Sequence, residues 1–464
     1  MSAGGMSAGP RRGGAAVVSR RALLGAGGGL FCAALPAVAA AGGASARDAA
    51  DFGLVADSPE DQGPALRAAL EALSSAGGGA LFLPAGRFRL SEVVLPPGTV
   101  LEGVPGRTLL EPAGGETVLR AQDAPGLRLR GLRFRGRGGV GGDDWSGLVV
   151  LAGCTDLAIG DCRFEQAPGN GLLLEACAGR VAGCSLSGIH GAAIFSWNGA
   201  GLRITDNDIR DCGNLGIYLA REASGHDGAI VARNRISGID WKDGGNGQNG
   251  NAINAFRTDS VVISDNVISG CAFSAIRLHS TRNCHVGGNL CTDCAEVAIF
   301  SEFGFSGSVI ADNIIDTAAQ GISITNFDSD GRLATCTGNI VRNILPESAT
   351  NPDTTPVGIA AEADTVISAN LVEGVPGIGL ALGWGPYLRD VVASGNLLRG
   401  CDIAIGISIA EGAGGASVTG NRIRRAPGGL AISGMLWDEV AESDLAAGAG
   451  RYPALEISGN RIVG

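Results

Sequence analysis

A short asparagine-centred frame recurs along most of this chain and constrains its fold more than any other feature. The frame is (Ile/Val)-x-(Asp/Gly)-Asn-x-(Ile/Val/Leu), and its asparagines are Asn207, Asn234, Asn266, Asn289, Asn313, Asn339, Asn370, Asn396, Asn421 and Asn460. The shortest spacings are about 23 to 26 residues, a period typical of solenoids whose units stack and share one core. Because each unit shows the alternation of short strands, we predict an all-β fold, a parallel β-helix.

Each unit offers one asparagine at the same bend, which predicts a ladder of side-chain amides running along the stack. In the unit 261–279, apolar and polar residues alternate on both sides of Gly270, so we expect two strands per unit. Each ladder amide would bond to its neighbours above and below and to backbone groups at the bend. Upstream units keep the frame but place Leu132, Cys162 and Cys184 in this slot, which suits a buried position.

Composition and charge agree with a long, narrow, hydrophobic rod. The chain has 77 glycines, 5% aromatic residues and 45% hydrophobic residues in 464 positions. About 13 coils at roughly 4.8 Å each would give a rod on the order of 60 Å long. The formal net charge is −11, so nucleic acid is not expected as a partner.

Residues 1–41 have the pattern of an export signal. Ser19-Arg20-Arg21-Ala22-Leu23-Leu24 resembles a twin-arginine signal, and Ala37-Val38-Ala39 forms a small-x-small cleavage site. The apolar run between them is too short and too rich in glycine for a membrane span. We therefore predict export by the twin-arginine translocase, a periplasmic or secreted mature protein, and no membrane association of that mature form.

Residues 42–110 are predicted to form an N-terminal cap and the first strands. A helix is expected at about Gln62–Ser75, with Leu66, Leu70 and Leu73 on one face, followed by LFLPAGRFRL and VLPPGTVLEG. This order resembles the start of pectate-lyase-like and polygalacturonase-like proteins, which belong to the pectin-lyase-like superfamily. The resemblance implies a single-stranded right-handed parallel β-helix whose open end is covered by the helix. The sequence departs from the family pattern where it has VADSPEDQ.

Taken whole, the leader, the cap and the asparagine frame make the chain similar to twin-arginine-translocated β-helix repeat proteins, a resemblance that implies no activity. The repeat domain is assigned to residues 111–464, with inserted loops at 240–250, 345–356, 383–390 and 434–453. Loops on rigid coils are where such a scaffold carries specificity. The last loop is expected to fold over the C-terminal end, with a short helix.

The twelve cysteines are interpreted as core residues rather than as metal or disulfide ligands. Cys291 and Cys294 form a CxxC, yet the repeat frame puts both in inward columns, and no second CxxC completes a set of four ligands. The four histidines show no zinc-binding spacing. No cofactor is predicted. Calcium is possible for this superfamily but no motif supports it, and we predict no metal ligands.

Two columns of outward side chains follow from the alternation in the second strand of each unit. The first column is predicted to hold Leu173, Phe195, Tyr218, Asn254, Arg277, Phe300 and Ser323, and the second to hold Glu175, Trp197, Ala220, Phe256, His279, Glu302 and Thr325. Aromatic rings stack on sugar faces, and polar groups among them bond to hydroxyl groups. We therefore predict a polysaccharide partner for the strip, walled by the loop Arg221–Asp227 and the 240–250 insertion.

Within this strip the predicted substrate-binding residues are Glu175, Phe195, Trp197, Tyr218, Asn254, Phe256 and Phe300. For catalysis we assign His279 or Glu302 as general acid or base, and Arg277 as the group that pairs a substrate carboxylate or stabilises developing charge. The alternative is that these are ordinary outward residues of a sheet, which favours aromatic side chains and needs charge for solubility.

Three classes of function stay open at this point. A polysaccharide lyase or glycoside hydrolase would need two or three acids, or a basic residue beside a calcium site, on one outer face. A non-catalytic carbohydrate-binding or cell-envelope protein would need only the aromatic and polar face. A structural rod or oligomeric spike would show apolar outward columns. The oligomeric state does not follow from the sequence.

Overall fold

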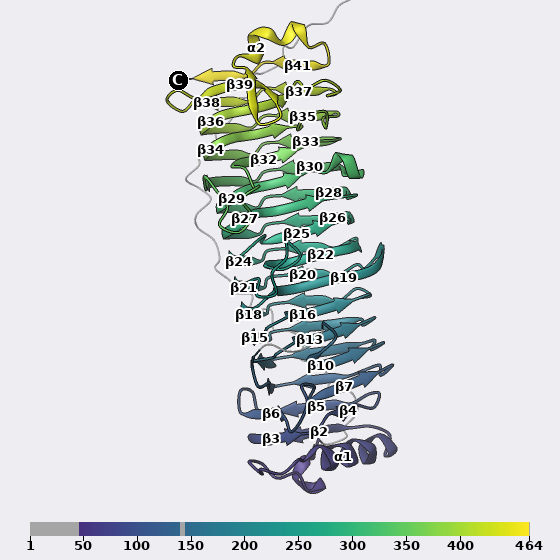
Figure 1. Cartoon of the computed structure of the whole chain (residues 1–464). Coiled ribbons are helices and arrows are strands. Elements are labelled where there is room, and N and C mark those ends of the chain that lie inside the picture. The colour runs from purple at the N-terminus through teal and green to yellow at the C-terminus, as the bar shows by residue number, and fades with distance from the viewer. Residues whose placement is uncertain (1–45, 140–143, 464) are drawn as a thin grey trace, which may run out of the picture. The chain divides into compact units, whose positions relative to one another are not determined.

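The computed structural model describes residues 46–139 and 144–463. The predicted export signal at 1–41 lies outside these residues. The described chain forms a stack of about 14 turns, one more than predicted, in which the strands of successive turns pair in parallel (Figure 1). The predicted parallel β-helix is therefore confirmed.

One sheet of the stack has 16 parallel strands. In spatial order they are β1 (Arg47–Asp48), β2 (Ala80–Leu83), β5 (Val100–Gly103), β8 (Arg128–Arg130), β11 (Leu157–Gly160), β14 (Gly179–Ala182), β17 (Arg203–Thr205), β20 (Ile230–Ala232), β23 (Val262–Ser264), β26 (Arg282–Gly287), β28 (Ser306–Ala311), β30 (Arg332–Thr337), β33 (Thr365–Ser368), β35 (Val391–Ser394), β37 (Ala416–Thr419) and β41 (Leu455–Ser458).

The remaining strands form the other sides of the coil. Those that follow directly after the first sheet are β3 (Gly86–Leu90), β6 (Thr108–Pro112), β9 (Leu132–Arg135), β12 (Arg163–Glu165), β15 (Ser185–Ser187), β18 (Asp208–Cys212), β21 (Arg235–Ile239), β24 (Val267–Cys271), β31 (Ile340–Ile344), β38 (Arg422–Arg424) and β42 (Arg461–Val463).

The third side of the coil carries the outward columns and is called the site face. Its strands pair in the order β4 (Val93–Val94), β7 (Leu119–Gln122), β10 (Gly147–Ala152), β13 (Asn170–Glu175), β16 (Ala192–Trp197), β19 (Leu215–His226), β22 (Asn251–Asp259), β25 (Ile276–His279), β27 (Leu290–Glu302), β29 (Ile314–Ile324), β32 (Val357–Ala361), β34 (Leu371–Leu382), β36 (Leu397–Ser408) and β39 (Leu430–Leu436). Some of these strands, such as β27, also cover the second side.

The prediction of two strands per unit was wrong, because each unit is divided at its asparagine. The unit 261–279 holds three strands, β23, β24 and β25. The residue before each ladder asparagine has a left-handed backbone, from Asp206 at φ 60° to Gly459 at φ 66°. This conformation turns the chain and breaks the strand, and Gly and Asp adopt it at lower cost than most residues. It explains why Gly or Asp usually precedes the asparagine.

The predicted asparagine ladder is present from Asn207 to Asn460. In a typical rung, Asn266 Nδ2 donates to Asn289 Oδ1 at 2.9 Å and to the carbonyl of Val231 at 3.1 Å, while its Oδ1 accepts from the Asn234 backbone N–H at 2.9 Å. The ladder starts where the Cys184 N–H donates to Asn207 Oδ1. The upstream slots Leu132, Cys162 and Cys184 are buried, as predicted.

The core is a continuous column of apolar side chains inside the coils. Cys291 pairs with Ile268 and Cys294 with Cys271 in the inward columns that the repeat frame predicts, and both thiols are buried. The cysteines from Cys154 to Cys401 are free and buried. Burial raises the pKa of the Cys401 thiol to about 11.

Both ends of the described stack are covered. Helix α1 (Gly63–Ser75) lies across the first coils and buries Leu66, Leu70 and Leu73, as predicted. At the other end β40 (Glu439–Glu442) pairs antiparallel with β39, and the short helix α2 (Leu445–Gly448) lies beyond it, within the predicted 434–453 insertion (Figure 1). Short 3-10 turns occur at Ala49–Phe52, Phe327–Ser329 and Ala449–Arg451. Among the described residues, no helix has the length and hydropathy needed to span a membrane.

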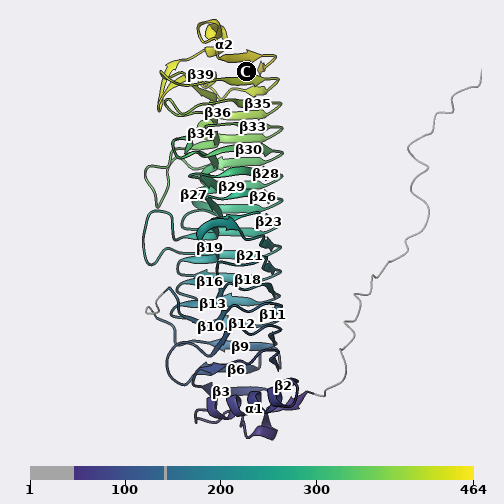
Figure 2. The same ribbon diagram turned by 90° about the vertical axis from the view of Figure 1, so that its right-hand side faces the viewer.

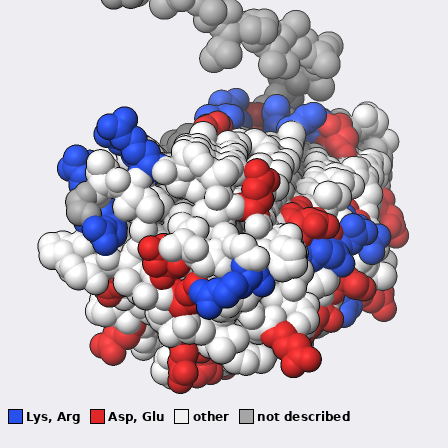
Figure 3. Space-filling view, turned by 90° about the horizontal axis from the view of Figure 1, so that it is seen from above, with Lys and Arg blue, Asp and Glu red and all other residues white. Residues whose placement is uncertain are grey.

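Several charged side chains on the outside of the coils are paired between neighbouring turns. The arginines that alternate along β8 and β9 bond to acids of adjacent coils, for example Arg130 to Asp161 at 3.1 Å and Arg133 to Glu165 at 2.6 Å. Seen along the stack, acidic and basic side chains are interspersed on the visible surface (Figure 3). The arginine stripe is therefore largely neutralised.

Candidate functional site

The site face carries both predicted columns in the predicted register. Strand pairing joins each member to the next, from Leu173 to Ser323 in the first column and from Glu175 to Glu302 in the second. The alternation holds because inward neighbours on the same strands fill the core. Inserted loops project from this side of the stack (Figure 2) and cover parts of the columns. The chemical roles predicted for these residues therefore depend on what the loops leave open.

An open cavity of about 460 Å³, here called the aromatic cavity, lies over β13, β16 and β19. Phe195, Trp197 and Tyr218 from the predicted columns line it, together with Trp145 from the turn before β10. The rings contact one another: Phe195 stacks on Tyr218 with centroids 4.9 Å apart, and Trp145 meets Trp197 edge to face at 5.3 Å. Trp145 is 47% exposed, so the cluster presents open ring surface to a ligand.

A histidine and an aspartate face the same cavity. His190 Nε2 lies 2.9 Å from Asp243 Oδ1, and the aspartate is held in turn by Asn214, whose Nδ2 donates to Asp243 Oδ2 at 2.5 Å. The Asp243 backbone N–H also donates to Asn214 Oδ1 at 3.0 Å. An imidazole oriented by a carboxylate is a common arrangement for proton transfer. Asp144 lines the cavity as well, so it contains two carboxylates.

The three residues predicted to be catalytic come together, but they are not an open site. Arg277 is 9% exposed and Glu302 is 2% exposed. Arg277 Nε and Nη2 donate to the two oxygens of Glu302 at 2.6 and 2.9 Å, and His279 Nδ1 lies 3.0 Å from the same carboxylate. Burial would raise the pKa of Glu302, but the hydrogen bonds from His279 and Arg277 outweigh it and hold that pKa below its usual value. Glu302 is therefore ionised and fully engaged.

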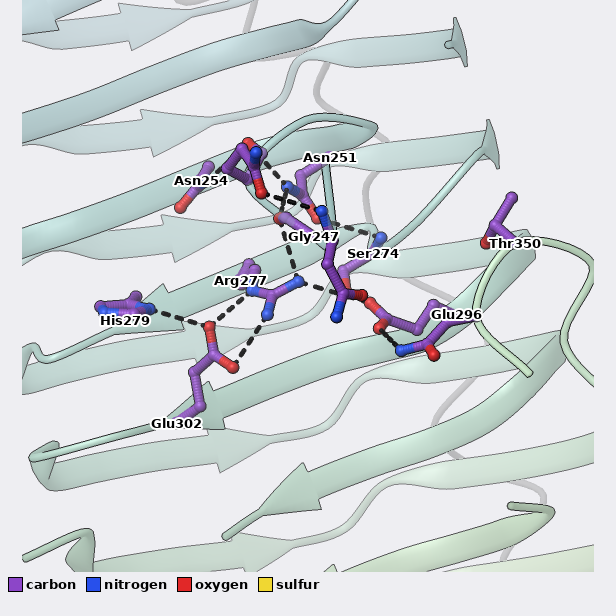
Figure 4. Close-up of polar contacts among 12 residues, drawn as sticks. Gly247, Asn251, Asn254, Ser274, Arg277, His279, Glu296, Glu302 and Thr350 are labelled. Carbon is purple, nitrogen blue, oxygen red and sulfur yellow. Dashed lines mark hydrogen bonds and ion pairs between the residues drawn. The ribbon is translucent and has the colours of Figure 1, made fainter. Parts of the chain in front are cut away.

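Arg277 connects the two insertions that cover the middle of the site face (Figure 4). Its Nη1 donates to the Gly247 carbonyl at 3.0 Å and to Glu296 at 3.4 Å. Glu296 also accepts from Asn351 at 2.8 Å, which ties the 345–356 loop to the same cluster. A side chain on Gly247 would collide with the guanidinium, since an added Cβ would lie 2.0 Å from Nη1. The role of Arg277 toward a substrate carboxylate stays a prediction, although four of its five N–H donors bond within the protein.

The other predicted binding residues lie outside the aromatic cavity. Glu175 is exposed beside Trp197 in the register. Asn254 is buried beneath the 240–250 insertion, where its Nδ2 lies 3.4 Å from the Gln248 carbonyl. Phe256 packs against the His279 ring at 4.9 Å. Phe300 lies under the Arg277 guanidinium, 5.1 Å from its ring centre.

Sequence reasoning missed Trp145, His190 and Asp243. Trp145 and His190 lie in turns that precede strands, outside the alternating positions that define the columns. Asp243 belongs to the 240–250 insertion, which was predicted to wall the strip and does line the cavity. Of these three residues only Asp243 carried a signal in the sequence, its position in an insertion. Among residues 46–139 and 144–463, no group of three or more His, Cys, Asp or Glu side chains is placed to hold a metal ion.

Residues 128–247 match the family model described as "Right handed beta helix region". The description agrees with the parallel strand pairing and with the right-handed coil that the sequence predicts. The matched residues include β13, β16 and β19, which form the floor of the aromatic cavity.

Curated relatives match shorter stretches. Mannuronan C5-epimerase AlgE3 of Azotobacter vinelandii is 36% identical over 89 residues, which are 19% of this chain and 5% of that protein. Mannuronan C5-epimerase AlgE4 of the same organism is 34% identical over 82 residues, which are 18% of this chain and 15% of the relative. The chain therefore spans only a small part of the length of these relatives.

Among solved structures, the N-terminal fragment of bacteriophage Phi29 gene product 12 superposes with a TM-score of 0.52 at 14% identity. The superposition covers 90% of this chain and 70% of the fragment. At this identity the likeness concerns the fold alone.

Proposed function

We propose that the protein binds a polysaccharide in the aromatic cavity and that the His190–Asp243 pair transfers a proton to or from the bound sugar. One observation carries the proposal: a cluster of contacting aromatic rings and an oriented imidazole line the same open cavity. Ring faces bind the apolar faces of sugars, and convergent polar groups fix the hydroxyl groups. The names of the curated relatives, mannuronan C5-epimerases, support polysaccharide as the ligand class.

The lining of the aromatic cavity favours an uncharged sugar. Of its described lining residues, His190 is the only one whose side chain can carry a positive charge, and Asp144 and Asp243 are acids. Removing a proton beside a uronate carboxylate calls for a cation that neutralises that carboxylate. Arg277, the nearest candidate in the columns, is bonded to Glu302, Glu296 and Gly247. The cavity instead offers two carboxylates, and a pair of carboxyl groups is what acid-base cleavage of a glycosidic bond uses.

Non-catalytic binding is the second candidate, and the bonding of Asp243 favours it. Asn214 uses both its carbonyl and its amide to hold Asp243. The same contacts fix the 240–250 insertion against the coils, so the His190–Asp243 contact also has a structural use. Both candidates require the same ligand in the same cavity, and they differ only in whether the wild-type protein changes it.

The test is a panel of soluble neutral and anionic polysaccharides, measured for binding by affinity electrophoresis and for reducing ends and unsaturated products. The Trp197→Ala variant should bind its polysaccharide at least about fivefold more weakly, because losing an aromatic anchor commonly costs more than about 1 kcal/mol. Leu333→Ala, at an exposed apolar side chain outside the cavity, is the control. Equal binding by wild type and Trp197→Ala would rule out this cavity.

A His190→Ala variant separates the two candidates. If the wild type releases products and His190→Ala binds without releasing them, proton transfer by the pair is supported. If the wild type binds but releases none from any polysaccharide of the panel, the catalytic part is wrong and the binding function stands. Binding of none of the panel by the wild type would overturn both.

Export by the twin-arginine translocase, to the periplasm or the medium, is also our proposal. It is supported by the Arg20-Arg21 pair, the apolar run and the Ala37-Val38-Ala39 site. Replacing both arginines with lysine should retain the protein in the cytoplasm of a host with this pathway. Unchanged export of that variant, measured by cell fractionation, would contradict the proposal.

A further inference from the structure

A second cavity of about 350 Å³ lies on the same site face, over β29, β32, β34 and β36. Three of the predicted insertions meet around it. Asn351 to Thr355 come from the 345–356 loop, Trp384 from the 383–390 loop, and Met435 to Asp438 from the 434–453 loop. We call it the insertion cavity. Three insertions that are far apart in the sequence therefore form the walls of the same cavity.

The floor of the insertion cavity is hollow because the side chains of the first outward column become small there. From Ser323 the column continues through Ala360, Ala381 and Gly406 by strand pairing. All four are small, whereas the same column holds large side chains such as Tyr218 further upstream. The sheet is continuous, so the loss of side-chain volume itself opens space between the loops.

The walls of the insertion cavity are fixed by hydrogen bonds. Ser348 Oγ donates to the Ala295 carbonyl at 2.5 Å and Thr350 Oγ1 to the Ala272 carbonyl at 2.6 Å, which pins the 345–356 loop to the coils. Trp384 and Trp437 meet edge to face with centroids 4.5 Å apart. Each of these two tryptophans is 47% exposed. The cavity is therefore preformed and has open aromatic surface on one side.

Glu362 lies in the second column of this cavity and is 8% exposed. The Phe327 backbone N–H donates to its Oε2 at 2.7 Å. Burial, with a smaller contribution from the nearby Asp328 carboxylate, raises the pKa of Glu362 to about 7. Near neutral pH a large share of this carboxyl group is uncharged, so it can donate a hydrogen bond as well as accept one.

We propose that the insertion cavity is a second, separate carbohydrate site that takes an uncharged sugar segment, with Trp384 and Trp437 against a sugar ring and Glu362 bonded to its hydroxyl groups. Its described ionisable lining residues are all acids, namely Glu296, Asp353, Glu362 and Asp438, which disfavours an anionic ligand. The inference takes its ligand class from the proposed function but concerns a different cavity, so the two can fail independently.

The test uses short oligosaccharides that are not expected to reach both cavities at once. The probes are cellotetraose, maltotetraose, laminaritetraose and xylotetraose, with tetragalacturonate as the anionic comparison, each titrated calorimetrically into the full chain. At least one neutral probe should bind at two sites of the wild type. Trp384→Ala and Trp437→Ala should each abolish one site and keep the other, while Trp197→Ala should show the reverse pattern. Unchanged melting temperatures would show that the variants are folded.

The outcomes separate the two proposals. If binding of every neutral probe is insensitive to Trp384→Ala and Trp437→Ala, or if tetragalacturonate is the probe lost in those variants, the second site as proposed is overturned. If a neutral probe depends on Trp384 but none depends on Trp197, the second site stands and the aromatic cavity fails.

Two substitutions test the part assigned to Glu362. Glu362→Gln keeps a neutral group that donates and accepts, so it should bind within about threefold of wild type. Glu362→Ala should weaken binding about tenfold, the loss expected for a hydrogen bond worth roughly 1.4 kcal/mol. Equal binding by both variants and the wild type would overturn the role of this side chain.

Discussion

Replacing Asn266 with alanine should destabilise the coil stack far more than a typical polar-to-alanine change. The side chain makes two hydrogen bonds as donor, to Val231 O and Asn289 Oδ1, and accepts two from the backbone and side chain of Asn234. Alanine would leave the Asn234 N–H and the Val231 carbonyl without these partners, at a position 1% exposed. A buried group that loses its partner costs about 1 to 3 kcal/mol. We therefore expect a loss of about 4 kcal/mol.

Asn460→Ala is the matched control. Its side chain bonds to Val418 and Asn421 in the same pattern, but it is half-buried, so water can replace the lost partners and the loss should be about 1 kcal/mol. Asn266→Leu should not rescue stability, because leucine fills the slot but accepts no hydrogen bond. The measurements are urea unfolding midpoints by circular dichroism, and hydrogen exchange of the Asn234 amide, which should lose protection. Equal destabilisation by Asn266→Ala and Asn460→Ala would refute the reasoning.

Three further predictions concern backbone strain, pH dependence and thiols. Ala369 (φ 55°) and Gly395 (φ 65°) precede successive ladder asparagines, and both have a left-handed backbone that glycine adopts more easily than alanine. In urea unfolding, Ala369→Gly should therefore raise the stability of the fold and Gly395→Ala should lower it, each by about 1 kcal/mol. A change of the same sign in both variants would contradict a backbone cause. The pKa of Glu362 in the folded protein is about 7, above its usual value of 4.5, so its stabilisation is complete below pH 4.5 and is lost as pH rises through 7. Wild-type stability should fall by roughly 3 kcal/mol more than that of Glu362→Gln between pH 4.5 and 8, and parallel pH curves would show that the shift is absent. The cysteine thiols should react slowly with a thiol reagent in the folded protein at pH 7 and fully after denaturation, and rapid labelling of the native protein would disprove their burial.

The columns of the site face could be predicted because the repeat supplies their register. Once Asn266 fixes one unit and alternation fixes its strands, neighbours such as Arg277 and Phe300 follow without any structure. The predicted number of strands per unit was wrong because the alternation was taken to continue through Asp265. The left-handed backbone of Asp265 ends one strand, and the next strand begins after it. A residue other than glycine that has a left-handed backbone is hard to detect from the pattern of hydrophobic residues.

The accessibility of those columns could not be predicted. Arg277 occupies an outward position, yet Gly247 and Glu296 satisfy its donors from regions with no repeat pattern. His190 and Asp243 are 53 residues apart in the sequence and meet only because an insertion folds back over the coils. The sequence locates the insertions, but which side chains they place over which column depends on loop conformation, which periodicity does not encode.

The asparagine ladder has a direction along the chain. Three of the four side-chain hydrogen bonds of Asn266 go to groups of the preceding coil, Val231 and Asn234, and one goes forward to Asn289. Each coil added toward the C-terminus thus brings the asparagine Oδ1 that accepts from the backbone and side-chain N–H groups of the asparagine before it. The N–H groups of the new asparagine then await the Oδ1 of the following coil. From Asn207 onward, a chain synthesised from its N-terminus can therefore extend this stack one coil at a time, with every finished rung acting as the template for the next.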